Sequence, residues 1–372
     1  MPFTALGLNP HILQAIKEAG YTEPTPIQAA AIPIILTRND LTGIAQTGTG
    51  KTAAFTLPLL HHLALPTPPN QRPAIRALIL APTRELVVQI HENVQTYAKH
   101  LKLSIATVFG GVSERPQMQA LRAGTDLVIA TPGRLLDLMG QRCGDFSRLE
   151  CLILDEADRM LDMGFLPSIK RVIQALPQKR QTLLFSATLS KEIEGLTGLF
   201  QKNPKTIQIG RRSNPADTVA QWIYEVPKHL KMALLSHLLK DPAMDSVLVF
   251  TRTKHGADRI ARRLEDTGIK CATLHANRSQ NQRLRALADF RAGTVRVLVA
   301  TDIAARGIDV DGISHVVNLD FPMHAEDYVH RIGRTGRAQA IGDAISFVTH
   351  EDMPHLRTLE RFIGRGILRK TA

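Results

Sequence analysis

The chain has 372 residues, of which 44% are hydrophobic, so its length suits two domains with packed cores. It has no apolar run near the ~18 residues of a membrane span, and its N-terminus lacks the basic and apolar segments of a signal peptide. The three cysteines have no metal-ligand spacing, which predicts a cytoplasmic protein in a reducing environment.

The charge is unevenly distributed along the chain. Residues 1–204 hold 20 Lys and Arg against 16 Asp and Glu, and residues 205–372 hold 26 against 18, so the net charges are +4 and +8. An excess of positive charge favours a polyanionic partner such as RNA or DNA. From the charge alone, a basic surface that only promotes solubility is an equal alternative.

Five apolar runs in the first half have the length and composition of buried parallel strands. They lie at residues 41–45, 77–81, 127–130, 152–154 and 182–185. Each precedes a polar turn, at 48–52, 82–86, 131–134, 155–158 and 186–188. Functional groups placed just beyond the carboxyl ends of strands are typical of an open parallel α/β sheet.

The second half repeats this pattern. Apolar runs at 247–250, 295–300 and 315–319 precede turns at 251–253, 301–309 and 320–322. Between the halves, residues 201–217 are rich in Pro, Gly, Asn and charge, as in a linker or an edge segment. We therefore predict an α/β fold of two similar domains, each a mostly parallel sheet flanked by helices. The predicted bounds are 1–204 and 218–372, with a linker at 205–217.

Residues 45–52 have the pattern of a phosphate-binding loop between a strand and a helix. Gly48, Gly50, Lys51 and Thr52 match G-x-x-x-x-G-K-[ST], and Ala45 replaces the first glycine. In such a loop, backbone N–H groups cradle nucleotide phosphates, the lysine contacts the β- and γ-phosphates, and the hydroxyl binds Mg²⁺. A glycine-rich turn that only caps a helix is the alternative.

An acidic cluster directly follows the apolar run that ends at Leu154. Asp155 is suited to hold Mg²⁺ through water, and Glu156 is suited to orient or deprotonate an attacking water. Acidic residues also cap helix N-termini, so by itself the cluster leaves a purely structural role open. Together with the phosphate loop, it predicts a site that hydrolyses ATP.

Two further segments carry candidate catalytic or coupling groups. His330–Arg337 contains arginines at 331, 334 and 337, which could neutralise phosphate charge in the transition state or contact a nucleic-acid backbone. The hydroxyls of Ser186–Thr188 could hydrogen-bond Asp155 or Asp158 and so link the nucleotide to other parts, although a helix cap is the simpler reading.

Other segments suit recognition of the adenine and of a nucleic acid. Gln28 could hydrogen-bond an adenine edge, and Phe3 could stack on the base or serve only as a core anchor. The turns Pro82–Glu85, Gly110–Gly111 and Thr131–Arg134 offer hydroxyls, N–H groups and arginines that suit a sugar-phosphate backbone. Because aromatic residues are only 5% of the chain, we expect little base stacking and largely sequence-independent binding.

The ordered set of motifs resembles the DEAD-box ATP-dependent RNA helicases of superfamily 2, over essentially the whole chain. The motifs lie at residues 20–28, 45–52, 82–86, 110–111, 131–134, 155–158, 186–188, 250–252, 280–283, 300–302, 306–309 and 330–337. Ala45 is normal in that family, and Ala157 favours its DEAD group over its DEAH group. The N-terminal sequence and residues 249–256 look most like those of the bacterial RhlE-type subgroup.

The resemblance implies two RecA-like domains that bind ATP, Mg²⁺ and RNA across the cleft between them, with ribosome assembly and RNA decay as settings for protein partners. ATP would be bound by Phe3, Gln28, Thr47, Gly48, Gly50, Lys51, Thr52 and Asp309, and Mg²⁺ by Thr52 and Asp155. Catalysis would use Lys51, Asp155, Glu156, His330, Arg334 and Arg337, of which Arg334 and Arg337 would be arginine fingers. Coupling would use Ser186, Thr188 and Asp158, and RNA would be bound by Arg84, Gly111, Thr131, Arg134, Arg252, Arg283 and Thr301.

The main functional hypothesis is an RNA-dependent ATPase that unwinds short RNA duplexes or remodels RNA–protein complexes as its two domains close. A clamp that holds RNA under the control of ATP is the first alternative, and it would show slow turnover and long-lived binding. An ATPase that acts on DNA is the second. RNA would be distinguished from DNA by contacts to its 2′-hydroxyl groups.

Overall fold

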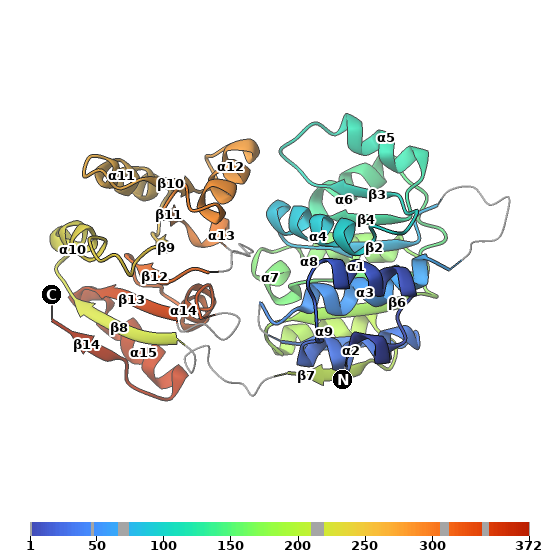
Figure 1. The fold of residues 1–372 in the computed structure, drawn as a ribbon, viewed down its shortest axis with the longest axis horizontal. Helices are drawn as coiled ribbons and strands as arrows, with labels where there is room; N and C mark the ends of the chain where they lie inside the picture. Colours follow the sequence, from blue (N-terminus) through green and yellow to red (C-terminus); the bar gives the residue numbers. More distant parts are fainter. Residues whose placement is uncertain are drawn as a thin grey trace. The chain divides into compact units, whose positions relative to one another are not determined.

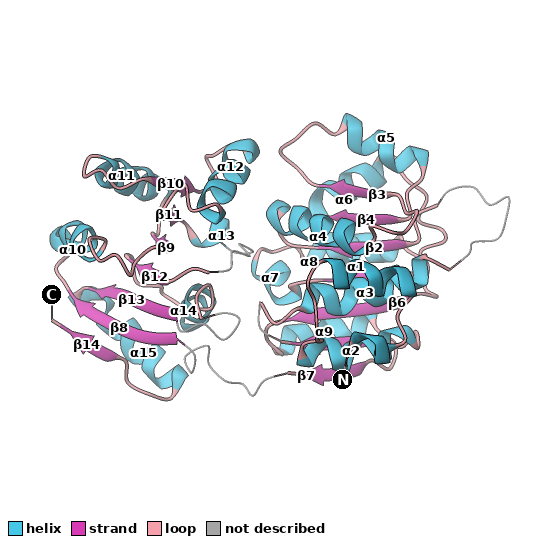
Figure 2. Ribbon diagram, in the orientation of Figure 1, coloured by secondary structure: helices cyan, strands magenta, loops and turns pink. Residues whose placement is uncertain are grey.

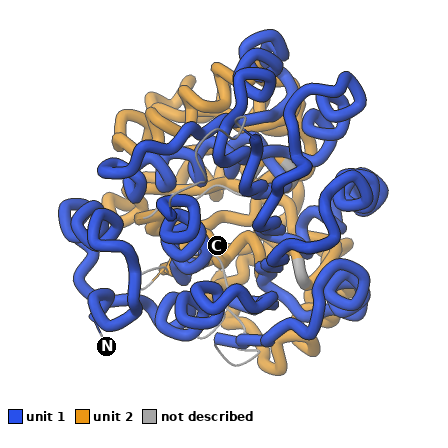
Figure 3. The backbone as a smooth tube through the Cα atoms, turned by 90° about the vertical axis from the view of Figure 1, so that its right-hand side faces the viewer, with its two compact units in different colours: residues 1–211 blue, residues 212–372 orange. Residues whose placement is uncertain are grey.

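The computed structural model describes residues 2–45, 48–65, 74–209, 219–305, 312–336 and 342–371. The chain divides into two compact units, residues 1–211 and 212–372, which Figure 3 distinguishes by colour. None of the helices in the described ranges has both the length and the apolar character that a bilayer-spanning segment requires.

The described part of the first unit contains a seven-stranded parallel sheet, whose strands lie among helices in Figures 1 and 2. The order of the strands is β3-β4-β2-β5-β6-β1-β7. Its strands are β1 (Leu41–Ile44), β2 (Ala77–Leu80), β3 (Ile105–Val108), β4 (Leu127–Ala130), β5 (Cys151–Leu154), β6 (Gln181–Ser186) and β7 (Lys205–Gln208). Its helices are η1 (Phe3–Leu6), α1 (Pro10–Glu18), α2 (Pro26–Leu36), α3 (Lys51–Leu63), α4 (Arg84–Tyr97), α5 (Arg115–Ala123), α6 (Pro132–Gly140), α7 (Ala157–Asp162), α8 (Leu166–Gln174) and α9 (Lys191–Phe200).

Two apolar clusters pack on the opposite faces of this sheet. One lies beneath η1 and α1–α4, and the other beneath α5–α9. Strands β1, β2, β4 and β5 are buried at every residue because helices cover both faces, which explains their uninterrupted apolar sequences.

The second unit contains, within its described residues, a seven-stranded parallel sheet with the order β10-β11-β9-β12-β13-β8-β14. Its strands are β8 (Val219–Glu225), β9 (Val247–Phe250), β10 (Cys271–Leu274), β11 (Val297–Ala300), β12 (His315–Asn318), β13 (Gly342–Val348) and β14 (Leu368–Lys370). Its helices are η3 (Lys228–Leu230), α10 (Lys231–Leu238), α11 (Lys254–Glu265), α12 (Gln280–Arg291), α13 (Asp302–Ala305), α14 (Ala325–Ile332), η4 (His350–Asp352) and α15 (Met353–Ile363).

The two sheets have the same topology. When the strands are numbered within each unit, both sheets have the order 3-4-2-5-6-1-7. In the second unit, α10 and α11 contribute to one apolar cluster, whereas α12 and α14–α15 contribute to two others. The prediction of two similar α/β units is therefore confirmed.

The structure contains all eight predicted strands, as β1, β2, β4, β5, β6, β9, β11 and β12. One predicted boundary is wrong, because residues 205–208 are not linker but form β7, which pairs with β1. This strand lies at the sheet edge and is largely exposed, so it lacks the apolar run that marks a buried strand. Residues 210–218 lie outside the described ranges.

Candidate nucleotide and nucleic-acid sites

Three of the predicted motifs lie at one edge of the first sheet. Strands β5, β6 and β1 are neighbours in that sheet and run parallel, so their carboxyl ends meet at the same edge. The phosphate loop follows β1, the acidic cluster follows β5, and Ser186–Thr188 ends β6. The Ala45 N–H donates to the Ser186 carbonyl at 3.0 Å, which ties the start of the loop to β6.

The described part of the phosphate loop is shaped by two glycines with positive φ, Gly48 at 79° and Gly50 at 90°. Helix α3 begins at the next residue, Lys51, whose side chain is only 6% exposed. The Lys51 ammonium donates to the Ala45 carbonyl at 2.6 Å, so it lies across the loop. Thr52 follows in the first turn, where N–H groups and the helix dipole favour an anion. Thr47 lies outside the described residues.

Gln28 packs directly against this loop. Its amide nitrogen donates to the Gly50 carbonyl at 3.2 Å, and its amide oxygen accepts the Thr25 N–H at 2.9 Å within a capping box. A Cβ on Gly50 would overlap the Gln28 amide, so the glycine is required by both its φ and its contact. This arrangement links the Gln28 motif physically to the phosphate loop.

Asp155 is a buried carboxyl group, 3% exposed, at the end of β5. Burial raises the pKa of Asp155 to about 7; the Glu156 carboxylate adds to this shift, and Lys51 opposes it. The Glu156 N–H donates to the Asp155 carboxylate at 3.0 Å. A bound cation would stabilise the charged form of such a group.

The donor set fits Mg²⁺. Among the described residues, no cluster of three or more His, Cys, Asp or Glu side chains could hold a metal ion. Mg²⁺ does not require such a cluster, because it is usually held by one or two carboxylates, waters and substrate phosphates. Asp155 and the Thr52 hydroxyl could supply the protein ligands.

Glu156 adopts the left-handed conformation, with φ at 49°, and its side chain forms an ion pair with Arg159 at 2.7 Å. Arg159 is only 6% exposed. The sequence analysis did not single out Arg159, although its position three residues after Glu156 is the spacing at which side chains on one helix face can meet.

Asp158 joins the acidic cluster to the end of β6. One of its carboxylate oxygens accepts the Ala187 N–H, the Thr188 N–H and the Thr188 hydroxyl at 3.0, 3.1 and 3.3 Å. The Ser186 hydroxyl accepts the Thr188 N–H at 3.3 Å. Asp155 and Asp158 were the two predicted partners of Ser186–Thr188, and the structure places Asp158 against this segment.

Phe3 lies in the apolar cluster beneath η1 and α1–α4 and is 5% exposed. This is the placement of a core anchor, and it leaves little ring surface for stacking on a base. The burial of Phe3 could be anticipated because apolar residues follow it at positions 5, 6 and 8, but its partners could not.

Four predicted RNA contacts in the first unit gather around the loop that follows β3. A Cβ on Gly111, whose φ is 79°, would overlap the Arg84 guanidinium. Arg134 donates to the Val112 carbonyl at 3.3 Å, and the Thr131 N–H donates to the Val108 carbonyl at 2.9 Å. Arg84, Gly111, Thr131 and Arg134 thus belong to one local surface built by β3, α4 and α6.

The predicted RNA contacts of the second unit occupy different strand ends. Asp320 accepts the Arg252 N–H at 2.8 Å and the Thr251 hydroxyl at 2.9 Å, which leaves the exposed Arg252 side chain beyond β9. Thr301 follows β11 and donates its N–H to Leu274 at 3.2 Å, and Arg283 lies in the first turn of α12.

Arg331 is the residue of the His330–Arg337 segment whose structural role is clearest. It is 4% exposed and forms two hydrogen bonds with Asp302, at 2.6 and 2.7 Å. It also donates to the Asn318 side chain and to the Asp320 carbonyl, so it joins α14 to the ends of β11 and β12. Sequence reasoning assigned no separate role to this arginine.

The two neighbours of Arg331 in the predicted catalytic set also lie on α14 or just after it. Arg334 is 7% exposed and donates to the His330 carbonyl at 3.2 Å. His330 lies in the last turn of α14. The other two predicted ATP-site residues of this unit, Asp309 and Arg337, lie outside the described residues.

Comparisons with known proteins agree with this architecture. The DEAD/DEAH box helicase family matches residues 25–196, and the helicase conserved C-terminal domain matches residues 230–339. The chain is 43% identical over 370 residues to the ATP-dependent RNA helicase RhlB of Pseudomonas syringae pv. tomato, covering 98% of this chain and 93% of that protein. It is 42% identical over 360 residues to the DEAD-box ATP-dependent RNA helicase CshA of Streptococcus pneumoniae, covering 97% and 68%.

The fold is also similar to that of solved structures. A structure of S. cerevisiae Dbp5 bound to RNA and ADP BeF3 matches with a TM-score of 0.89 and 31% sequence identity. The match covers 99% of this chain and 95% of the Dbp5 chain. The similarity therefore extends over both seven-stranded sheets.

Proposed function

The chain belongs to the DEAD-box ATP-dependent RNA helicases, and from this premise we propose that it is an RNA-dependent ATPase that unwinds short RNA duplexes locally or remodels RNA–protein complexes. The observation that carries the proposal is the convergence of the phosphate loop, the acidic cluster and Ser186–Thr188 at the ends of β1, β5 and β6. This edge combines the groups that bind phosphate with the groups that activate water.

The first unit would bind the nucleotide and prepare the attacking water. Lys51 would leave the Ala45 carbonyl for the β- and γ-phosphates, while Gln28 would contact the adenine. Mg²⁺, held by Thr52 and Asp155, would neutralise charge on the phosphates. Glu156 would orient the water and accept its proton, and the Arg159 guanidinium would hold the Glu156 carboxylate in place.

The second unit would complete the reaction. Arg334 and Arg337 would stabilise the charge that develops on the transferred phosphoryl group, and Asp309 would contact the ribose. Each unit would also carry part of the RNA surface: Arg84, Gly111, Thr131 and Arg134 in the first, and Arg252, Arg283 and Thr301 in the second. A ligand that binds to both units favours their closed state and raises the affinity for the other ligand.

Dbp5 in complex with RNA and ADP BeF3, a structural neighbour, supports the use of both ligands by this chain. The assignment to the RhlE-type subgroup rests on the N-terminal sequence and on residues 249–256, whereas the relatives reported above bear the names RhlB and CshA. Action in the cytoplasm agrees with the three free cysteines, Cys143, Cys151 and Cys271. Protein partners in ribosome assembly or RNA decay are the natural candidates for such an activity.

Strand displacement tests this proposal directly. The chain should separate a short RNA duplex in the presence of ATP and Mg²⁺, and Lys51→Ala should reduce the rate by at least about 10²-fold because the phosphates lose a positioned cation. Lys102→Ala, which alters an exposed lysine outside the site, is the matched control and should retain full activity. Near-normal displacement by Lys51→Ala would contradict the assignment of the phosphate loop.

A further inference from the structure

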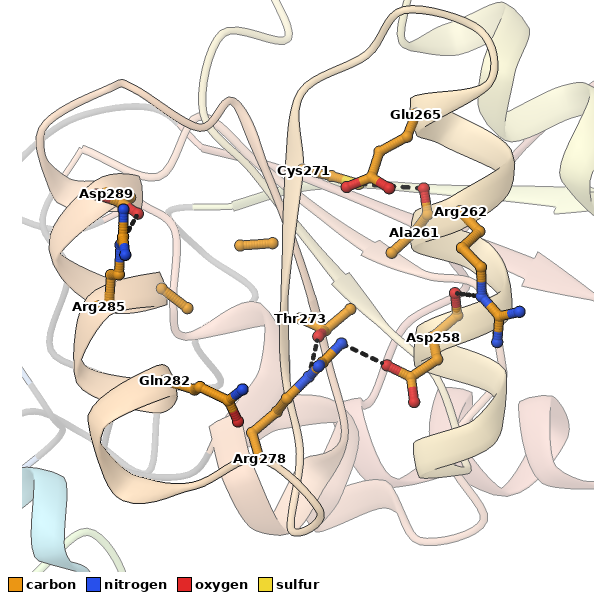
Figure 4. A pocket seen from close by; sticks show the side chains of 12 residues that line it. Asp258, Ala261, Arg262, Glu265, Cys271, Thr273, Arg278, Gln282, Arg285 and Asp289 are labelled. Atoms are coloured by element: carbon orange, nitrogen blue, oxygen red, sulfur yellow. Dashed lines mark hydrogen bonds and ion pairs between the residues drawn. The ribbon is translucent and has the colours of Figure 1, made fainter.

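A groove of about 540 Å³ lies between α11 and α12 in the second unit, and none of its lining residues is among those assigned to ATP (Figure 4). Each helix lines it with one face at positions i, i+3, i+4 and i+7: Asp258, Ala261, Arg262 and Glu265 on α11, and Gln282, Arg285, Ala286 and Asp289 on α12. Each face carries an alanine flanked by polar or charged residues. The small side chains at the base keep the groove open.

Strand β10 forms the floor of this groove. Within the described part of the chain it is an edge strand of its sheet and pairs with β11 on one side only. Cys271 packs toward the α11 cluster, and Ala272 packs toward the α12 cluster, so the two helices cover opposite faces of the sheet. The groove between them therefore follows the free edge of β10.

The free edge presents backbone hydrogen-bonding groups. Leu274 accepts the Thr301 N–H from the end of β11, so the backbone groups of Leu274 point toward β11. Because successive residues of a strand alternate in direction, Ala272 also faces β11, whereas Cys271 and Thr273 direct their N–H and C=O groups into the groove. An unpaired strand edge is a template for another strand.

We propose that this groove binds one extended peptide segment of a partner protein, which adds to β10 as an eighth strand of the sheet. Backbone hydrogen bonds to Cys271 and Thr273 would fix its register, as in other cases of strand addition. Its alternating side chains would face Ala261 on one wall and Ala286 on the other, which favours apolar side chains of moderate size. A lysine or arginine would pair with the exposed Glu265 at one end of the groove.

The charges on the walls favour a peptide over RNA. Three arginines, Arg262, Arg278 and Arg285, are balanced by Asp258, Glu265 and Asp289. Two of the arginines already pair with carboxylates of the groove, Arg278 with Asp258 at 2.8 Å and Arg285 with Asp289 at 3.7 Å. A surface without excess positive charge does not attract a polyanion.

The two walls also favour a single segment over a second copy of this chain. The β10 edge of another copy would carry its own α11 and α12, and these helices would meet α11 and α12 of the first copy before the two edges could pair. An isolated extended segment has no such helices. The four residues of β10, at about 3.3 Å per residue, form a continuous edge. A peptide strand of similar length can pair with it.

Selection from a phage library of random linear peptides on the full chain tests this proposal. The enriched peptides should alternate apolar residues and carry a basic residue. Ala286→Leu, which fills the groove, should weaken their binding by at least about tenfold, whereas Ala288→Leu, on the exposed side of the same helix, should not. Hydrogen exchange at the Cys271 and Thr273 amides should slow when a selected peptide binds.

A second variant keeps the test decisive if Ala286→Leu lowers the melting temperature. Glu265→Lys changes an exposed side chain and should shift the selection from basic to acidic peptides. The proposal is overturned if no peptide is enriched or if the enriched peptides bind Ala286→Leu as tightly as the unaltered chain. Protection of the two amides by single-stranded RNA, or a dimer in sedimentation that Ala286→Leu disrupts, would overturn it in favour of those occupants.

Discussion

At the level of single residues, the candidate nucleotide site of the first unit consists of buried or partly buried polar groups, each of which has a partner within the unit. Lys51 contacts a backbone carbonyl, Glu156 pairs with Arg159, and Asp158 accepts three hydrogen bonds. Such groups are costly to bury without partners, and these contacts satisfy them before any ligand arrives.

Glu156→Gln should separate binding from hydrolysis. The amide keeps the shape of the side chain but cannot accept a proton, so turnover should fall by about 10²- to 10⁴-fold while ATP-dependent RNA binding persists. The comparison is steady-state hydrolysis against RNA binding measured by fluorescence anisotropy. Glu194→Gln, at an exposed position of α9, should change neither quantity. Loss of RNA binding together with turnover would mean that Glu156 is structural.

Asp158→Ala should uncouple hydrolysis from unwinding. It removes the acceptor for the two N–H groups and the hydroxyl of Ala187 and Thr188, and hydrogen bonds to a charged group contribute about 1.5–3 kcal/mol each. We expect fewer duplexes separated per ATP hydrolysed. Asp137→Ala, an exposed aspartate of α6, is the control. If displacement and hydrolysis fell in the same proportion, Asp158 would not be a coupling residue.

At the level of elements, the site depends on how β1 packs between its neighbours. Gly43 in β1 has no space for a side chain, because a Cβ there would lie 2.7 Å from the Phe185 ring of β6. Phe185 in turn packs on Phe55 of α3, the helix that follows the phosphate loop. The position of the loop is thus linked to the packing of the core beneath it.

Gly43→Ala should therefore destabilise the first unit by about 1–3 kcal/mol, the usual cost of an overpacked core. Gly195→Ala provides the contrast, because a Cβ at this exposed position of α9 would meet nothing within 4 Å and alanine favours a helix. Chemical denaturation of both variants gives the comparison. If the two variants were equally stable, β6 would have to shift away from β1 at little cost in free energy to make room for the added methyl group.

The sequence identifies the strands that are buried at every residue better than the others, since it missed the edge strands and also the interior strands β8 and β13. Runs such as Cys151–Leu154 are apolar throughout because helices cover both faces of the sheet. The edge strands β7 and β14 have mostly or wholly exposed residues, so their sequences show no apolar run. Their pairing depends on the tertiary structure, which a local pattern does not encode.

The same limit applies to the candidate site. The phosphate loop and the acidic cluster are recognisable because their chemistry requires a fixed local spacing. The contacts of Gln28 with Gly50 and of Asp158 with Thr188 join residues far apart in the chain. Local spacing does not reveal such contacts, and the groove beside β10 is another arrangement of this kind.

At the level of the whole molecule, two sheets of identical strand order carry different chemistry. The first unit has the predicted phosphate loop, and the second has the larger net charge and its predicted RNA contacts beyond β9 and β11 and in α12. Repeating one fold twice therefore supplies two independent sets of loops at which functional groups can be placed.

The net positive charge of the chain should make its affinity for RNA strongly dependent on salt concentration. Four predicted arginine contacts, at residues 84, 134, 252 and 283, give an expected slope of about −3 in a plot of log K against log salt concentration for single-stranded RNA. Arg252→Gln should reduce the slope by about 0.7, whereas Arg259→Gln on the exposed face of α11 should leave it unchanged. An unchanged slope in Arg252→Gln would remove Arg252 from the RNA surface.

The most direct test of the central claim is steady-state ATP hydrolysis by the chain without nucleic acid, with single-stranded RNA, and with DNA of the same sequence. Strong stimulation by RNA alone is the result that an RNA-dependent ATPase predicts. Equal stimulation by DNA, or no stimulation by either nucleic acid, would contradict it.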